Sequence, residues 1–72
     1  IQGSVSGSII SRGVRVEKGA VVDGCILFKD TVVGKDAVLR HVIADKNVKV
    51  GSGVHLEGTE KYPMVLSKGA EV

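Results

Sequence analysis

Aliphatic residues recur along the chain at a fixed interval of seventeen positions. The segment Val16-Glu17-Lys18-Gly19-Ala20 is followed seventeen residues later by Val33-Gly34-Lys35-Asp36-Ala37, and after seventeen more by Val50-Gly51-Ser52-Gly53-Val54. Each copy starts with an aliphatic residue and ends with a small apolar one, with small or polar residues between them. A fixed period of this length is typical of a solenoid, in which each repeat is one unit stacked on the next.

The same period arranges the other apolar residues in columns. Six columns carry no charged residue, although charged residues make up 25% of the chain. The columns are Val5, Val22, Leu39 and Leu56; Ile9, Ile26 and Ile43; Ile10, Leu27 and Ala44; Val14, Thr31 and Val48; Val16, Val33 and Val50; and Ala20, Ala37 and Val54. Small residues in the last column and larger ones in the column before it fit a narrow triangular interior.

Within one period the apolar positions are six, five and six residues apart, from Val16 through Val22 and Leu27 to Val33. A helix needs spacings of three and four along one face, whereas short runs of β-branched residues favour strands. Three short strands per period form one triangular coil, and stacked coils pair as parallel strands about 4.8 Å apart. The sequence therefore predicts an all-β fold, a parallel β-helix of about four coils. The strict register and frequent turn signals disfavour the alternative, an antiparallel sandwich.

The pattern breaks down after Leu56. Glu60 falls in the isoleucine column, and residues 58–63 are predicted to be a loop leaving the coil, where Pro63 is tolerated because it cannot donate to a ladder. Segment 66–70 resembles Val16 to Ala20 but starts sixteen residues after Val50. We therefore predict coils in residues 1–61, followed by an exit loop and a terminal capping strand in residues 62–72. A cap protects strand edges that would otherwise promote aggregation.

Length and composition restrict the possible functions. The 72 residues form one small domain, and the repeat pattern is already present at Ile1, so we expect a piece of a longer protein. We also expect this piece to self-associate through open strand edges. A net charge of +2 and two aromatic residues argue against nucleic-acid binding. The single Cys25 fits a reducing cytoplasm, and no apolar run is long enough to cross a membrane. We expect a cytoplasmic protein without nucleic-acid or membrane partners.

Three basic residues, Arg12, Lys29 and Lys46, share one outward register and are predicted to stack on neighbouring coils. Like charges on neighbouring strands are mildly destabilising, so this column is a candidate functional site. It is interpreted either as a contact for an anion, a phosphate or the acidic face of a partner domain, or as a solvated corner. Lys18 and Lys35 form a shorter basic column, and Asp23, Arg40 and Glu57 form one of alternating charge that exposed ion pairs explain.

Candidates for catalysis are few. His41 and His55 are the possible general bases. They fall at different positions of the repeat, and neither has a carboxylate at a spacing that would make it a catalytic partner. No pattern would activate Cys25 as a nucleophile, so we expect a structural thiol. No zinc spacing and no phosphate-binding Gly-rich loop is present. We expect no catalytic residue, metal site or cofactor within these 72 residues.

Several segments resemble the tail domain of bacterial ADP-glucose pyrophosphorylase, also called glucose-1-phosphate adenylyltransferase. They are residues 8–16, Cys25-Ile26-Leu27, and Val42-Ile43-Ala44-Asp45-Lys46-Asn47-Val48, which is similar to the family's V-I-x-D-K/R-x-x-V-I segment. The ending Tyr62-Pro63-Met64-Val65-Leu66, followed by Lys68-Gly69-Ala70, is most similar to the GlgD-type glycogen biosynthesis subunit, which has Y-P-x-V-I followed by K-K-G. In this family the repeats form a left-handed β-helix, an exception to the usual crossover rule.

The resemblance implies a role in a larger protein. The parent would make ADP-glucose from glucose 1-phosphate and ATP with Mg²⁺, on an N-terminal catalytic domain that these residues lack. The tail domain packs on that domain, helps to assemble homo- or hetero-oligomers, and in some members contributes basic residues to a site for phosphorylated sugar effectors. By this resemblance Lys46, then Lys29 and Arg12, are the expected effector contacts.

Two alternatives stay open. One is the tail of a hexapeptide-repeat acyltransferase that uses His41 or His55 as base. The other is the tail of another sugar-phosphate nucleotidyltransferase, for example one acting on N-acetylglucosamine phosphate.

Overall fold

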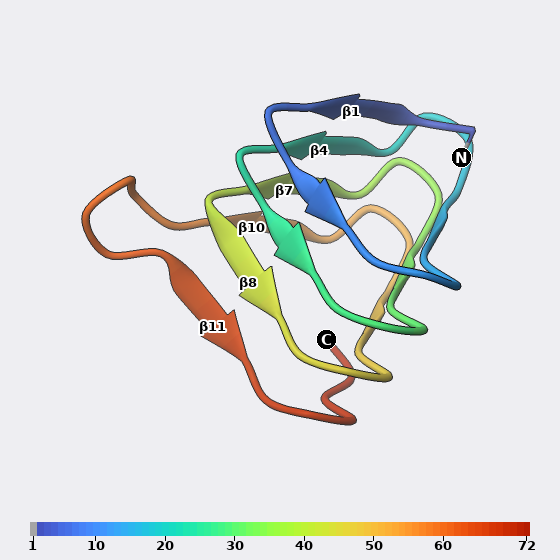
Figure 1. Cartoon of the computed structure of the whole chain (residues 1–72). Coiled ribbons are helices and arrows are strands. Elements are labelled where there is room, and N and C mark those ends of the chain that lie inside the picture. The colour runs from blue at the N-terminus through green and yellow to red at the C-terminus, as the bar shows by residue number, and fades with distance from the viewer. Residues whose placement is uncertain (1) are drawn as a thin grey trace.

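A computed structural model describes residues 2–72. In it the chain winds as a triangular coil of short strands (Figure 1). This part of the chain contains eleven strands and no helix. The strands are β1 (Ser4–Ser6), β2 (Ile9–Ile10), β3 (Arg15–Val16), β4 (Val21–Asp23), β5 (Ile26–Leu27), β6 (Val32–Val33), β7 (Val38–Arg40), β8 (Val42–Ala44), β9 (Lys49–Val50), β10 (His55–Glu57) and β11 (Met64–Leu66).

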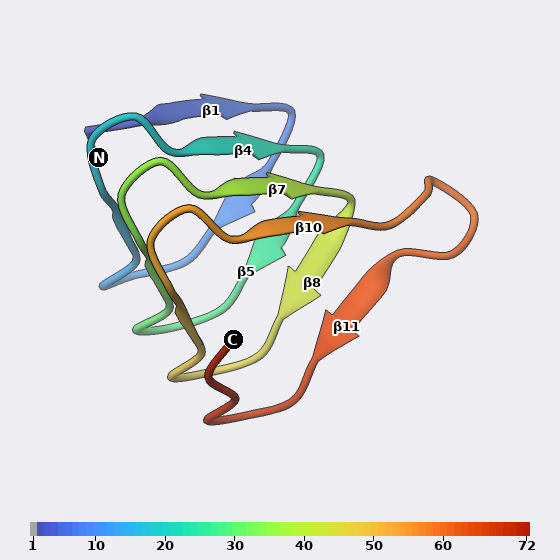
Figure 2. The ribbon, with the colours of Figure 1, turned by 180° about the vertical axis from the view of Figure 1, so that it is seen from behind.

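The strands form three flat sides. Side A has the order β1-β4-β7-β10, side B β2-β5-β8-β11, and side C β3-β6-β9, where an isolated bridge between Lys49 and Glu71 continues the stack. All pairs are parallel, and those of the first three coils join residues seventeen apart, such as Val5 with Val22 and Val22 with Leu39. The chain turns counterclockwise as the coils recede in Figure 1, so the β-helix is left-handed (Figures 1 and 2). The predicted β-helix is confirmed, and the antiparallel sandwich is wrong.

The interior is filled by inward-facing residues of the strands, two of them from β8, and by residues of the turns. Val22, Leu27, Val33, Leu39 and Ala44 are fully or almost fully buried and belong to one apolar cluster. The buried polar residue of this core, Thr31, donates its hydroxyl to the Asp45 carbonyl oxygen at 3.0 Å, which satisfies it without water.

One charge-free column lies outside this core. Ile9, Ile26 and Ile43 pair along side B, but their neighbours Leu27 and Ala44 take the inward positions because successive side chains of a strand point to opposite faces. Ile9 is 64% exposed, whereas Leu27 and Ala44 are 0% exposed. Absence of charge therefore does not separate inward from outward columns.

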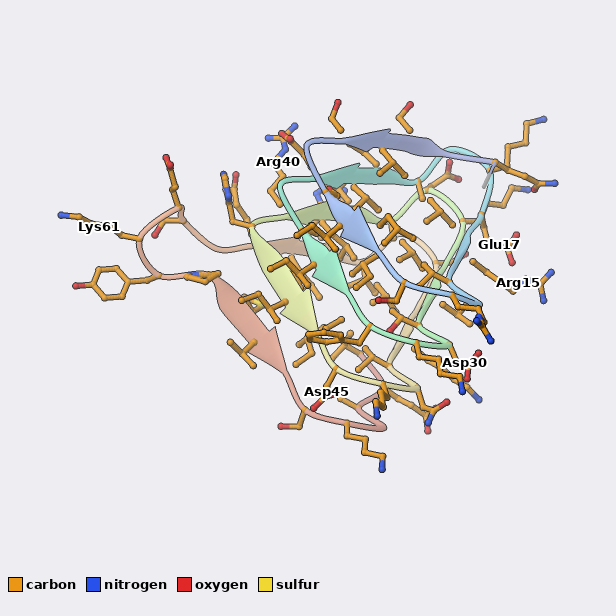
Figure 3. All side chains as sticks on the ribbon, viewed as in Figure 1. Arg15, Glu17, Asp30, Arg40, Asp45 and Lys61 are labelled. Atoms are coloured by element: carbon orange, nitrogen blue, oxygen red, sulfur yellow. The ribbon has the colours of Figure 1, made fainter. Side chains whose placement is uncertain are left out.

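The last coil contains the predicted loop. Residues 58–63 lie between β10 and β11 and protrude from the corner between sides A and B (Figure 2). Figure 3 shows Lys61 of this loop pointing away from the coils. Met64, Val65 and Leu66 pair with Val42, Ile43 and Ala44. Segment 66–70 is similar in sequence to Val16 to Ala20 but takes a different place in the coil, because the loop shifts the register and Leu66 stacks on the Ala44 column. The division at residue 61 stays a prediction.

Candidate anion-binding corner

The predicted basic residues lie at the corner between sides B and C, where four tight turns stack. We call Arg12, Lys29, Lys46 and Lys68 at this corner the basic column. Each is followed by a residue with positive φ: Gly13 (77°), Asp30 (61°), Asn47 (58°) and Gly69 (75°). Glycine, asparagine and aspartate are the residues that adopt this left-handed conformation most readily, so the local sequence determines the turn.

Hydrogen bonds between coils hold these turns in register. The backbone N–H of Asp30 donates to the Arg12 carbonyl oxygen at 3.2 Å, and the corresponding bonds run from Asn47 to Lys29 at 3.0 Å and from Gly69 to Lys46 at 3.0 Å. The basic residues therefore follow one another at the strand spacing of about 4.8 Å. The structure brings together Arg12, Lys29 and Lys46, and all three are exposed.

Lys68 is a fourth member that sequence reasoning missed. The loop of residues 58–63 breaks the seventeen-residue period, so counting from Lys46 does not reach Lys68. The signal was the turn itself, since Lys68 lies between a short polar residue and a residue suited to positive φ, as Lys46 does between Asp45 and Asn47.

The corner carries excess positive charge. Its acidic residues are Asp30 and Asp45, which Figure 3 labels near the turns. Asp45 is engaged locally, since its Oδ1 accepts the backbone N–H of Lys46 at 2.7 Å. Within residues 2–72, none of the four basic side chains forms an ion pair of 4.0 Å or less. Four cations against two carboxylates leave the corner basic and open to solvent.

A second corner, between sides C and A, is less suited to an anion. Gln2, Glu17, Lys18, Lys35 and Ser52 line an open depression of about 490 Å³ there. The basic residues that stack at this second corner are only two, Lys18 and Lys35, because Ser52 takes the next position, and Glu17 lies beside Lys18. Arg15 approaches Glu17 at 4.0 Å on the same part of the surface (Figure 3).

The alternating column is present on side A. Arg40 is paired in register with both Asp23 and Glu57. Its Nη1 lies 3.8 Å from Glu57 Oε2, with both side chains more than half exposed. An exposed pair of this kind contributes little to stability.

The two histidines do not form a site together. His41 lies at the corner between sides A and B with φ 52°, and its ring covers Gly24, where a Cβ would lie 3.1 Å from His41 Cε1. His55 is on β10, where it pairs with Val38 of side A. No group of three or more His, Cys, Asp or Glu residues that could hold a metal ion occurs within residues 2–72.

Cys25 has the environment of a structural thiol. It is buried, and its single S–H has two acceptors within reach of Sγ, the Leu39 carbonyl oxygen at 3.3 Å and the Asp23 carbonyl oxygen at 3.4 Å. Burial raises the pKa of the Cys25 thiol by removing water from the charged form. A thiol in this state is a poor nucleophile.

The described residues also include no helix that could span a membrane. The three-sided coil of parallel strands defines a hexapeptide-repeat protein of the left-handed β-helix class. Residues 1–61 match the family model described as "GlmU-like, C-terminal hexapeptide", and the chain belongs to this family.

Curated relatives are similar to nearly the whole chain. Glucose-1-phosphate adenylyltransferase of Corynebacterium jeikeium is 47% identical over 97% of this chain and 18% of its own length. The enzyme of the same name from Frankia casuarinae is 44% identical over 82% of this chain and 14% of its own length. The glycogen biosynthesis protein GlgD of Bacillus subtilis is 41% identical over 92% of this chain and 24% of its own length. The chain thus spans less than a quarter of these relatives, and no solved structure matches it.

Proposed function

We propose that the chain is the assembly and regulatory domain of a glucose-1-phosphate adenylyltransferase-like protein in glycogen biosynthesis. The relatives that match it carry these names and include both the transferase and GlgD. In this proposal the parent transfers an adenylyl group from ATP to glucose 1-phosphate with Mg²⁺ in the cytoplasm, on a catalytic domain outside these residues. The β-helix itself has no transferase activity and contributes to the assembly of homo- or hetero-oligomers.

The regulatory part of the proposal rests on one observation, the uncompensated basic column. Two unit charges about 4.8 Å apart in water repel each other by at most about 1 kcal/mol, and flexible side chains reduce this further. A bound dianion such as a sugar phosphate removes the repulsion and accepts hydrogen bonds from ammonium groups of two coils at once. Lys29 and Lys46 are the central members, so we assign them the main contacts with the effector.

A titration with inorganic phosphate and glucose 6-phosphate, followed by NMR of the ¹⁵N-labelled chain, tests effector binding. We expect saturable shifts of the amides around Lys29 and Lys46, which are lost in the Lys29→Ala/Lys46→Ala variant and kept in Lys18→Ala/Lys35→Ala. Equal shifts at both corners, or none, contradict the effector site. The same two variants, made in the full-length parent, should differ in their response to sugar phosphates. Unchanged activation curves in both variants would show that the basic column is a solvated corner without a role in effector binding.

A further inference from the structure

The basic column is a straight row that extends over all four coils. Its members Arg12, Lys29, Lys46 and Lys68 take the same position in four successive turns, and backbone hydrogen bonds of 3.0–3.2 Å join each turn to the next. At the strand spacing of about 4.8 Å, the row is about 14 Å long and runs along the solenoid axis. All four side chains are exposed. A single phosphate group is much shorter than this row, so it leaves part of the row without a counterion.

The two carboxylates of this corner lie against the backbone. Asp45 Oδ1 accepts the Lys46 backbone N–H at 2.7 Å, and Asp30 Oδ1 lies over Gly13, where a Cβ would collide with it. Within residues 2–72, neither carboxylate forms an ion pair of 4.0 Å or less. The four cationic groups therefore remain available to one ligand that runs along the row.

We propose that the basic column binds linear inorganic polyphosphate, with the chain of phosphoryl groups lying along the solenoid axis. This rests on the proposed anion site and extends it from one phosphate to a row of them. Neighbouring phosphoryl groups share one bridging oxygen, so they are closer together than the coils at about 4.8 Å. Each coil therefore meets a phosphoryl group, whichever part of the polymer is bound. Contacts with successive phosphates release counterions from the polymer, so the affinity rises with chain length.

The corner suits polyphosphate better than other linear polyanions. An extended acidic peptide presents a side chain on one face at every second residue, about 6.6–6.8 Å apart, so it does not keep register with the four coils. A single-stranded nucleic acid gains affinity from aromatic side chains on which its bases stack. Within residues 2–72, Phe28 is the one aromatic residue at this corner, and it is 42% exposed. Polyphosphate needs only repeated contacts with cations, and the row supplies these.

The test compares orthophosphate, tripolyphosphate and a polyphosphate long enough to span the four coils. Each is titrated into the ¹⁵N-labelled chain, and affinities are expressed per phosphoryl group, so that a longer polymer gains nothing from carrying more groups. The affinity should rise by about tenfold or more from orthophosphate to the long polymer, and the amides of all four turns should shift. With four contacts and the coefficient of single-stranded nucleic acids, the logarithm of the binding constant should fall with the logarithm of the salt concentration with a slope of about −2.8.

Two double variants separate the ends of the row from its centre. Arg12→Ala/Lys68→Ala should weaken binding of the long polymer by about tenfold and reduce the salt slope by about half, with binding of orthophosphate to the central pair unchanged. Lys18→Ala/Lys35→Ala removes the same charge from the corner between sides C and A. It should bind the polymer as the original chain does at about 0.15 M salt, where the screening length is about 8 Å. Spectra of both variants establish that they are folded.

Three results would overturn the proposal. These are an affinity per phosphoryl group that does not rise with chain length, equal losses in the two double variants, and binding of poly-glutamate that is as tight as that of polyphosphate of equal charge. The last result would assign the row to an acidic polypeptide instead. Orthophosphate binding without a gain for the long polymer contradicts the polyphosphate site alone. Polymer binding without any response of the full-length parent to sugar phosphates contradicts effector regulation alone.

Discussion

Val65 pairs with Ile43 on side B although twenty-two residues separate them, five more than the period of the other coils. The extra residues form the protruding loop, and the chain re-enters the coil where it left. Met64 N donates to the His41 carbonyl oxygen at 3.0 Å, as the ladder requires at this position. The loop is therefore an insertion at a corner that leaves the stacking of side B intact.

Deletion of residues 59–63 should restore the seventeen-residue period without loss of the fold. Gly58 would then be followed directly by Met64, as His41 is followed by Val42. Closing a shorter loop costs less entropy, so we expect the melting temperature to stay the same or to rise slightly. Thermal unfolding by circular dichroism measures this, and loss of cooperative unfolding would show that the loop contributes to the core.

The inward column of side A predicts a gradient of stability along the solenoid. Leu39 is 0% exposed between two coils, whereas Leu56 in the last coil is only half-buried. We expect Leu39→Ala to lower the free energy of unfolding by about 2–5 kcal/mol, and Leu56→Ala by clearly less, because its cavity opens to solvent. Urea unfolding compares the two variants, and equal losses would argue that another element covers the last coil.

The seventeen-residue period was enough to predict the three-sided coil and the stacking of Arg12, Lys29 and Lys46, because a parallel β-helix transfers the sequence register directly into space. Two features were beyond its reach. Ile9 and Ile10 are both apolar, so the sequence does not say which of them faces inward. Lys68 lies past an insertion whose length follows from where the chain re-enters the coil, and this depends on packing of β11 on β8.

The buried thiol predicts a loss of stability in alkaline solution. Burial raises the pKa of Cys25 above its ordinary value of 9.0, so the folded chain holds this proton more tightly than the unfolded chain. The contribution is fully present below pH 9.0 and is lost as the pH rises through the folded-state pKa. Urea unfolding from pH 7 to pH 10 should show a decline that is smaller in Cys25→Ala, since other groups titrate equally in both chains. A decline of the same size in both would exclude Cys25 as its source.

The basic column should weaken the fold at low ionic strength. Lys29 and Lys46 lie on neighbouring coils without an ion pair within residues 2–72, so replacing either by glutamine removes a like-charge contact. We expect Lys46→Gln to stabilise the chain by a few tenths of a kcal/mol in dilute buffer, and the gain to disappear at about 1 M salt, where the screening length falls to about 3 Å. Lys61→Gln on the protruding loop is the control, because Lys61 points away from the coils (Figure 3). If both variants respond to salt alike, the net charge of the chain and not the column determines the effect. If added phosphate stabilises the original chain and so removes the difference in stability between it and Lys46→Gln, the anion relieves the same repulsion.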